Sequence, residues 1–251
     1  FSTEENKSKK LHAVLIVGPL EDGTDSAIKS MNKIADYLES QNVIVEKFYN
    51  KYSDWDKIKK SAKKTHFFIY SGHGSTLGKG GNSGGLCNKN MISTQTILEE
   101  LEFKNNPIVI FKSVCRGAGS SAGDNRDIGI KEATKRVSNY STPFLKLGAS
   151  CYYANNLGKG CLSFLQNLFD GKSLETCFIE SSKSWCKIEF SKKHTLNETQ
   201  NIAIASTDWG GTATQTTYIN GKKTVKKVKV HKSYDIAYIG KKDFTLNELK
   251  E

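Results

Sequence analysis

The sequence predicts an α/β/α sandwich, three layers with a mostly parallel central sheet, and three observations lead to this fold class. Short and nearly continuous apolar runs recur along the chain, as expected of strands buried on both faces of a sheet. Segments with apolar residues at helical spacing separate these runs, and helical crossovers between strands give parallel pairing. The length of 251 residues suits one well-buried domain of this kind.

The first half of the chain alternates predicted strands and helices. The run at 11–19 reads LHAVLIVGP and stops at Gly-Pro, which indicates the end of a buried strand. Thr24 and Asp25 begin a helix, and Ser53 with Asp56 resembles a capping box at the start of a second helix. The predicted elements, in order, are a strand at 11–19, a helix through 28–38, a strand at 43–49, a helix at 53–62, a strand at 65–71, a helix at 93–101 and a strand at 107–114.

The second half continues this pattern and then becomes β-rich. The predicted elements are a helix at 127–137, a strand at 149–154, mostly helix at 158–187 and a strand at 201–206. Asn220-Gly221 lies between two β-prone flanks and predicts a hairpin turn. We expect a single domain over 1–251, with a flexible N-terminus at 1–10 and a C-terminal β extension, the hairpin, over about 213–251.

The net charge of +11 raises the question of an anionic partner. The lysines lie in separate groups, at 7–10, 59–64 and 222–232, and no nucleic-acid-binding motif accompanies them. The run at 222–232 is interpreted as an edge strand protected by lysines. We therefore expect a solvated surface and no nucleic-acid partner. No apolar run approaches the roughly 18 residues that span a bilayer, so no membrane span is expected.

The cysteines and glycines predict no metal and no cofactor. The six cysteines form no CxxC pair and no zinc-binding spacing with histidine. Gly117, Gly119 and Gly123 imitate a dinucleotide-binding loop, but they follow the fourth strand and no apolar helix begins after them. Because the chain begins at Phe1, we expect a processed product. A secreted or periplasmic location, which would allow one or two disulfides to form, is the first expectation, and a cytoplasmic location is the alternative.

Two strand ends carry chemically useful residues. The third strand leads into Tyr-Ser-Gly-His-Gly at 70–74, and the fourth leads into Ser-Val-Cys-Arg-Gly at 113–117. The carboxyl ends of parallel strands open into one crevice, so we expect His73 and Cys115 to face each other if the strands are neighbours. Cys115 alone would more often be a buried strand-end cysteine, and the histidine motif makes a catalytic role the better interpretation.

A thiol acts as a nucleophile when a base takes its proton, and the unperturbed pKa of histidine suits that role near neutral pH. Acyl transfer also needs donors for the developing oxyanion, and the backbone amides of Gly74 and Cys115 are the candidates. Glycines beside both residues leave room for the main chain of a substrate.

These two motifs resemble those of the caspase-like (clan CD) cysteine peptidases, which include caspases, metacaspases, legumains, clostripain and gingipains. Tyr-Ser-Gly-His-Gly is similar to the metacaspase histidine motif, and Ser-Val-Cys-Arg-Gly is similar to the caspase nucleophile signature. The resemblance implies a caspase-like sandwich and a Cys–His dyad, with Cys115 as nucleophile and His73 as base. It also implies that IAIASTDWGGT at 202–212 borders the substrate, which nominates Asp208 and Trp209.

The expected activity is that of a cysteine endopeptidase acting on peptide or protein substrates. Ser113 replaces the glutamine that caspases place two residues before the nucleophile, so the caspase aspartate pocket is not expected. With Glu21, the acidic residues Asp22 and Asp25 near the first strand end predict a pocket for a P1 arginine or lysine, the residue before the cut bond. The alternatives are a catalytically silent caspase-like module that binds peptides and, further off, a nucleotide-dependent oxidoreductase. The oligomeric state is left open.

Overall fold

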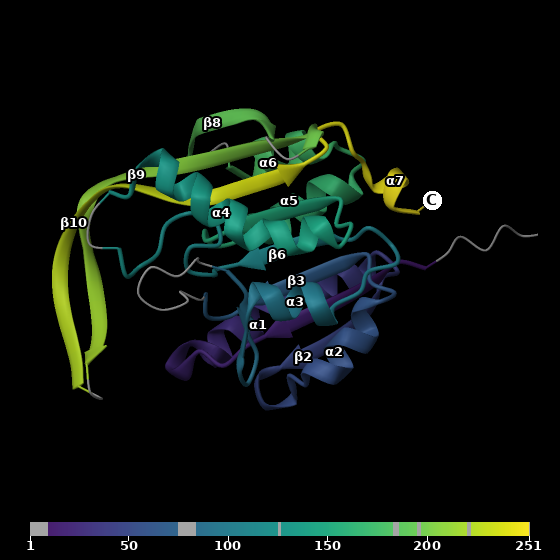
Figure 1. Cartoon of the computed structure of the whole chain (residues 1–251), viewed down its shortest axis with the longest axis horizontal. Coiled ribbons are helices and arrows are strands. Elements are labelled where there is room, and N and C mark those ends of the chain that lie inside the picture. Colours follow the sequence, from purple (N-terminus) through teal and green to yellow (C-terminus); the bar gives the residue numbers. More distant parts are fainter. Residues whose placement is uncertain are drawn as a thin grey trace, which may run out of the picture.

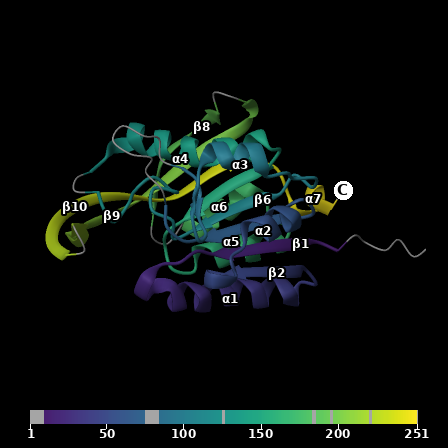
Figure 2. The ribbon, with the colours of Figure 1, turned by 60° about the horizontal axis from the view of Figure 1, so that its bottom comes forward.

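The computed structural model describes residues 10–74, 84–124, 127–182, 186–194, 197–219 and 222–250. It contains an eight-stranded sheet between two layers of helices (Figures 1 and 2). This architecture confirms the predicted fold class, an α/β sandwich with a mostly parallel sheet and antiparallel strands near the C-terminus.

The main sheet has the strand order β2-β1-β3-β6-β7-β10-β9-β8. Its strands are β1 (His12–Val17), β2 (Ile44–Tyr49), β3 (Phe67–Ser71), β6 (Ile108–Lys112), β7 (Cys151–Asn155), β8 (Lys187–His194), β9 (Asn197–Ile219) and β10 (Lys222–Gly240). The five strands from β2 to β7 in this order pair in parallel. β10, β9 and β8 continue the sheet in antiparallel pairs. A second sheet is formed by β4 (Leu86–Cys87) and β5 (Met91–Ile92).

Helices cover both faces of the main sheet. The helices are α1 (Thr24–Ser40), α2 (Trp55–Ala62), α3 (Thr94–Glu100), α4 (Gly129–Lys146), α5 (Gly160–Phe169), α6 (Leu174–Ser182) and α7 (Leu246–Lys250). The cores on the two faces contain α1, α5, α6 and α7 on one side and α2, α3 and α4 on the other. Figure 2 shows α3 and α4 on the opposite side of the sheet from α1.

Strand periodicity explains how one sheet supports two cores. Leu15 and Val17 of β1 belong to the core beneath α1, whereas Val14 and Ile16 belong to the core beneath α2. Each of these four side chains is at most 1% exposed. Successive strand residues point to opposite faces, so an uninterrupted apolar run is the pattern that a doubly covered strand requires.

The structure corrects the sequence analysis in several places. The N-cap of α2 is Asp54, whose carboxylate accepts a hydrogen bond from the Lys57 amide, so the predicted capping box of Ser53 and Asp56 is wrong. The Ser53 hydroxyl is buried without a partner among the described residues. The small sheet of β4 and β5 and the strand β8 were not predicted, and the strand predicted at 201–206 is part of a much longer strand, β9.

β9 and β10 form a long antiparallel ribbon. Ile219 pairs with Lys222, as expected of the hairpin predicted at Asn220-Gly221, although those two turn residues lie outside the described residues. Residues 236–240 of β10 also pair with β7 inside the main sheet. The residues further along the ribbon, 208–219 and 222–232, are called the β-arm, which Figure 1 shows projecting from the body and bending.

The predicted C-terminal β extension, over about 213–251, therefore lies only in part outside the body of the protein. The second half of β10 is a central strand of the sheet, and Leu246 and Leu249 of α7 belong to the core beneath α1. The expected flexible N-terminus, 1–10, lies almost wholly outside the described residues. Within the described part of the chain, no helix has the length and apolar character needed to cross a bilayer.

Candidate active site

His73 and Cys115 follow two neighbouring strands of the sheet. β3 and β6 pair in parallel, with Tyr70 opposite Phe111, so both loops leave the same edge of the sheet. The loops also touch, because Gly74 packs against the backbone of Cys115. A methyl group added to Gly74 would collide with the Cys115 carbonyl group, with its carbon at 2.9 Å. The two motifs that the sequence analysis paired therefore meet in space through their main chains.

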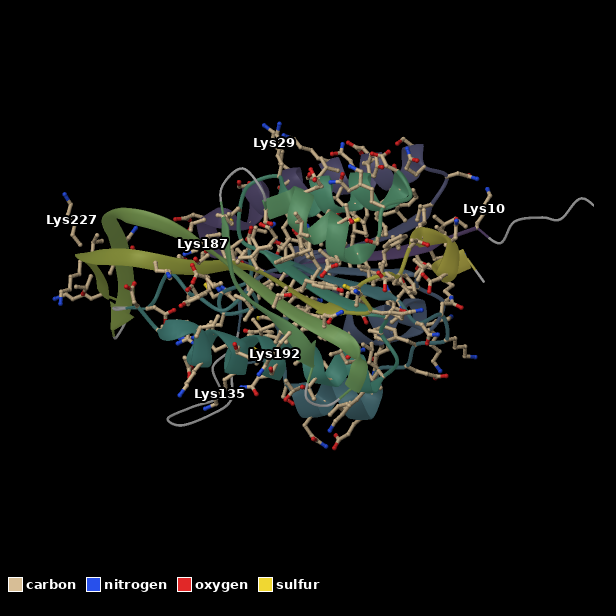
Figure 3. The ribbon with its side chains drawn as sticks, turned by 90° about the horizontal axis from the view of Figure 1, so that it is seen from above. Lys10, Lys29, Lys135, Lys187, Lys192 and Lys227 are labelled. Carbon is tan, nitrogen blue, oxygen red and sulfur yellow. The ribbon has the colours of Figure 1, made fainter. Side chains whose placement is uncertain are left out.

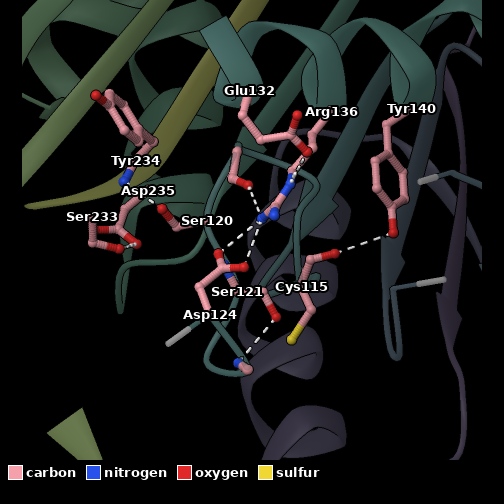
Figure 4. Close-up of polar contacts among 12 residues, drawn as sticks. Cys115, Ser120, Ser121, Asp124, Glu132, Arg136, Tyr140, Ser233, Tyr234 and Asp235 are labelled. Carbon is pink, nitrogen blue, oxygen red and sulfur yellow. Dashed lines mark hydrogen bonds and ion pairs between the residues drawn. The ribbon is translucent and has the colours of Figure 1, made fainter. Parts of the chain in front are cut away.

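Three buried tyrosines fix the carbonyl groups of these loops. The Tyr70 hydroxyl donates to the His73 carbonyl at 2.7 Å, and the Tyr140 hydroxyl donates to the Cys115 carbonyl at 3.1 Å (Figure 4). The Tyr152 hydroxyl donates to the Gly117 carbonyl at 2.9 Å.

The three rings share one neighbour, Phe111, with ring centroids 5.1 to 5.8 Å from its own. Burial raises the pKa of Tyr70 and of Tyr152, which keeps these hydroxyls protonated as donors. The sheet thus presents a rigid platform of aromatic rings whose polar ends hold both loops.

The backbone around the site adopts conformations that side chains usually avoid. Six described residues other than glycine have positive φ, and three of them are asparagines, which tolerate this region. The other three are Glu21 (φ 46°), Ser113 (φ 56°) and Arg116 (φ 68°). Ser113 and Arg116 flank Cys115 in the chain, and Glu21 contacts His73. Such strained residues concentrate at functional sites, where the surrounding structure compensates their cost.

Two backbone amides at the site have no acceptor. Among the described residues, neither the Gly74 nor the Cys115 amide donates a hydrogen bond. The amides that follow are engaged, since Arg116 donates to the Ser120 carbonyl at 2.8 Å and Gly117 donates to the Val114 carbonyl at 2.9 Å. Both residues are only partly buried, so their amides can donate to a group that reaches the site from solvent. The sequence analysis nominated these two amides as oxyanion donors.

Glu21 holds the ring of His73. The Glu21 carboxylate lies 3.0 Å from His73 Nε2, which leaves Nδ1 as the ring nitrogen available to other groups. The turn that carries Glu21 is fixed by Thr24, whose hydroxyl accepts from the Leu20 amide at 2.8 Å and donates to the Glu21 carbonyl at 3.1 Å. The sequence analysis named Glu21 only as an acidic neighbour of a substrate pocket, and its contact with the histidine was missed.

The loop after Cys115 is braced from α4 (Figure 4). Arg136 donates to both Asp124 carboxylate oxygens, at 2.8 and 3.0 Å, and to the Gly119 carbonyl at 3.1 Å. Its Nε also donates to Glu132 at 2.9 Å. The side chains of Arg136 and Asp124 are only 11% and 14% exposed, so this pair is well protected from water. A single guanidinium nitrogen, Nη1, makes all three contacts to Asp124 and Gly119, and these charge-assisted hydrogen bonds hold the loop against α4.

The same loop is attached to β10. The Ser120 amide donates to the Tyr234 carbonyl at 2.9 Å, and the Tyr234 amide donates to the Ser120 hydroxyl at 2.9 Å. Further along, the Lys232 amide donates to the Asp127 carboxylate at 3.0 Å. The base of the β-arm is therefore bonded to the loop that carries Cys115.

The predicted substrate-binding residues lie in different parts of the molecule. Ser113 is exposed beside Cys115, and Asp22 is exposed in the turn before α1. Asp25 lines a groove along α1 with Ile28, Lys29, Asn32, Lys33 and Asp36, and no described contact joins it to Ser113. Asp208 lies opposite Lys232 in the β9–β10 ribbon. The side chains of Asp208 and Trp209 lie outside the described part, so their predicted contact with substrate stays a prediction.

Lys112 is a further charged residue at this edge, and sequence reasoning missed it. It is the last residue of β6, it is only 8% exposed, and its Nζ lies 3.4 Å from the Ser113 hydroxyl. No carboxylate pairs with it among the described residues. A lysine in a strand that otherwise reads IVIF was the available signal, since a buried lysine needs a partner or a role.

Comparisons with known proteins add no family assignment. No protein-family model matches the chain, and no curated protein matches it significantly. Among the described residues, no cluster of His, Cys, Asp and Glu could hold a metal ion. All six cysteines are unpaired thiols, so the structure contains none of the disulfides that an exported protein could have formed. The arrangement thus offers a half-exposed thiol, an imidazole held by a carboxylate and two amides without an acceptor among the described residues, which together suit acyl transfer.

Proposed function

We propose that the protein is a cysteine endopeptidase with Cys115 as nucleophile and His73 as general base. The observation that carries the proposal is the contact of the two strand-end loops, in which the Gly74 and Cys115 amides have no acceptor among the described residues. The resemblance of both motifs to those of caspase-like peptidases supports the same conclusion. The rival is a silent module that binds peptides without cleaving them, and it has no need of a strained nucleophile turn.

The reaction follows from these groups. His73 takes the proton of the Cys115 thiol as the sulfur attacks the carbonyl carbon of the scissile peptide bond. The oxygen of that carbonyl gains negative charge, and the amides of Gly74 and Cys115 donate to it. The C–N bond then breaks as His73 gives the proton to the leaving amine. Water, deprotonated by His73, attacks the thioester, and the acid product and the free thiol are released.

For the P1 residue we propose arginine or lysine, on the basis of Asp22 and Asp25. Lys112 has the opposite implication, because an ammonium group at the pocket would favour an acidic P1 side chain. A fluorogenic peptide library varied at P1 decides between them. Faster hydrolysis after Arg and Lys supports the basic pocket, and faster hydrolysis after Asp and Glu assigns specificity to Lys112.

Alkylation should be selective for Cys115. Burial raises the pKa of the other five thiols, Cys87, Cys151, Cys161, Cys177 and Cys186. The pKa reaches about 12 for Cys161 and about 11 for Cys186, so these thiols are almost wholly protonated near neutral pH. With one equivalent of iodoacetamide at about pH 7.5, peptide mapping should find most of the label on Cys115. Equal labelling of Cys87 would contradict an activated Cys115.

Replacing Glu21 by glutamine should reduce turnover modestly. Glu21→Gln keeps a hydrogen-bonding group near His73 Nε2 but removes the charge that supports the protonated ring. The Glu21 side chain is 76% exposed, so an effect of about 1 kcal/mol or less, a fall of up to about fivefold in kcat, is expected. KM should not change. Glu102→Gln, which breaks the surface pair with Lys63, is the control and should leave kcat unaltered. An unchanged kcat in Glu21→Gln would show that Glu21 does not position His73.

A further inference from the structure

The β-arm carries close to half of the net charge of the chain. From 208 to 232 the sequence has six lysines and one carboxylate, Asp208, a charge of +5 out of the total of +11. Lys222, Lys223, Lys226 and Lys227 are exposed, and none of them makes an ion pair within the described residues. Figure 3 shows Lys227 on the projecting ribbon, far from Lys10 and Lys29 on the body.

The strand opposite these lysines supplies no negative charge. The lysines at 222, 223, 226 and 227 pair with Ile219, Tyr218, Gln215 and Thr214, in that order. Protection of an exposed strand edge, for which lysine is the usual residue, explains why charges are present, but it does not exclude carboxylates on the neighbouring strand. A ribbon with lysines alone repels itself, and a polyanion removes that repulsion.

The lysines lie on both faces of the ribbon. Neighbouring residues in a strand point to opposite faces, so Lys222 and Lys226 share one face, and Lys223 and Lys227 share the other. The two lysines on each face are about 13 Å apart along the strand, because they are four residues apart and each residue adds about 3.3 Å. A flat anionic surface such as a bilayer would contact one face only. The major groove of B-form DNA admits a two-stranded β-ribbon and has phosphates on both walls.

We propose that the β-arm binds double-stranded DNA by inserting into the major groove, with lysines on each face contacting the phosphates of one wall. The contacts are with the backbone, so binding is independent of base sequence. This proposal differs from the expectation of no nucleic-acid partner, and the binding experiment below decides between the two. In the sequence the lysines of the chain lie in separate groups, whereas the ribbon places four of them on its two faces, opposite uncharged residues of β9. It does not rest on the proposed peptidase activity.

The test measures binding of the full chain to a fluorescein-labelled DNA duplex of about 20 base pairs by anisotropy. Four phosphate contacts predict a loss of about 10²-fold in affinity between 50 and 200 mM salt. In a quadruple variant, glutamine replaces the lysines at 222, 223, 226 and 227. This variant should lose most of its affinity for the duplex and most of the salt dependence of that affinity. The control is a second quadruple variant, in which glutamine replaces four exposed lysines of the body, Lys10, Lys29, Lys57 and Lys60. It should bind the duplex with nearly the wild-type affinity and salt dependence.

Two double variants test the groove geometry. Lys222→Gln with Lys226→Gln and Lys223→Gln with Lys227→Gln should each weaken duplex binding by a similar factor, about tenfold, because each pair serves one wall. Loss confined to one pair would instead indicate a flat partner and overturn the proposal. No measurable binding at 50 mM salt, equal loss in the body variant, or vesicles with anionic lipid that bind as well as the duplex would overturn it too.

Discussion

Replacing Cys115 by alanine is expected to lower kcat/KM for peptide hydrolysis by about 10⁴-fold or more, because no other group at the site can form the thioester. The thiol is half-buried in a turn, and its removal leaves the tyrosine contact to the Cys115 carbonyl in place. The melting temperature should therefore change by less than about 2 °C. Fluorogenic peptide assays and a thermal melt on the same preparation measure both quantities.

The control for this prediction is another half-buried cysteine. Cys186→Ala changes a thiol outside the two strand-end loops and should leave kcat/KM at the wild-type value. His73→Ala should lose about 10²- to 10⁴-fold, the usual contribution of a general base. If Cys115→Ala kept its activity, the proposed mechanism would be wrong. If the wild-type chain cleaved no peptide of the P1 library, the silent peptide-binding module would be the better account.

The fold class could be predicted from the sequence because the buried strands are uninterrupted apolar runs. Runs such as PIVIF at 107–111 are apolar without interruption, and only a strand covered on both faces needs that pattern. β9 was found only in part, since its outer half is threonine-rich and lacks either an apolar run or a clear alternation. The Asp54 cap was missed because Ser53 and Asp54 both suit that position, and only the backbone path selects one of them.

The site could be predicted where it follows from strand order and not where it follows from long-range packing. His73 and Cys115 lie at adjacent strand ends, which a βαβ pattern implies. Tyr140 reaches the Cys115 carbonyl from the middle of α4, 25 residues further along the chain, and no local pattern indicates that contact. Glu21 contacts His73 only because a short helical turn with positive φ presents it. Such contacts depend on three-dimensional placement.

Replacing Gly74 by alanine is expected to damage the site although the change adds one methyl group. Gly74 does not have positive φ, so the cost comes from collision and not from the backbone dihedral. The methyl carbon would lie 2.6 Å from the Tyr140 hydroxyl and would overlap the Cys115 carbonyl group. Relief requires the two loops to separate, which displaces thiol and imidazole. A displacement of about 1 Å can cost about 10²-fold in rate, and overpacking costs about 1–3 kcal/mol in stability.

Two further variants identify which collision matters. Gly123→Ala places its methyl 3.6 Å from the nearest atom, the Ser121 hydroxyl, and should leave kcat/KM and the melting temperature near wild type. Combining Gly74→Ala with Tyr140→Phe removes the hydroxyl contact but keeps the overlap with the Cys115 carbonyl. We expect this double variant to stay nearly as inactive as Gly74→Ala, because main chain yields less readily than a side chain. Full recovery would mean that Tyr140, and not the contact of the two loops, sets the position of Cys115.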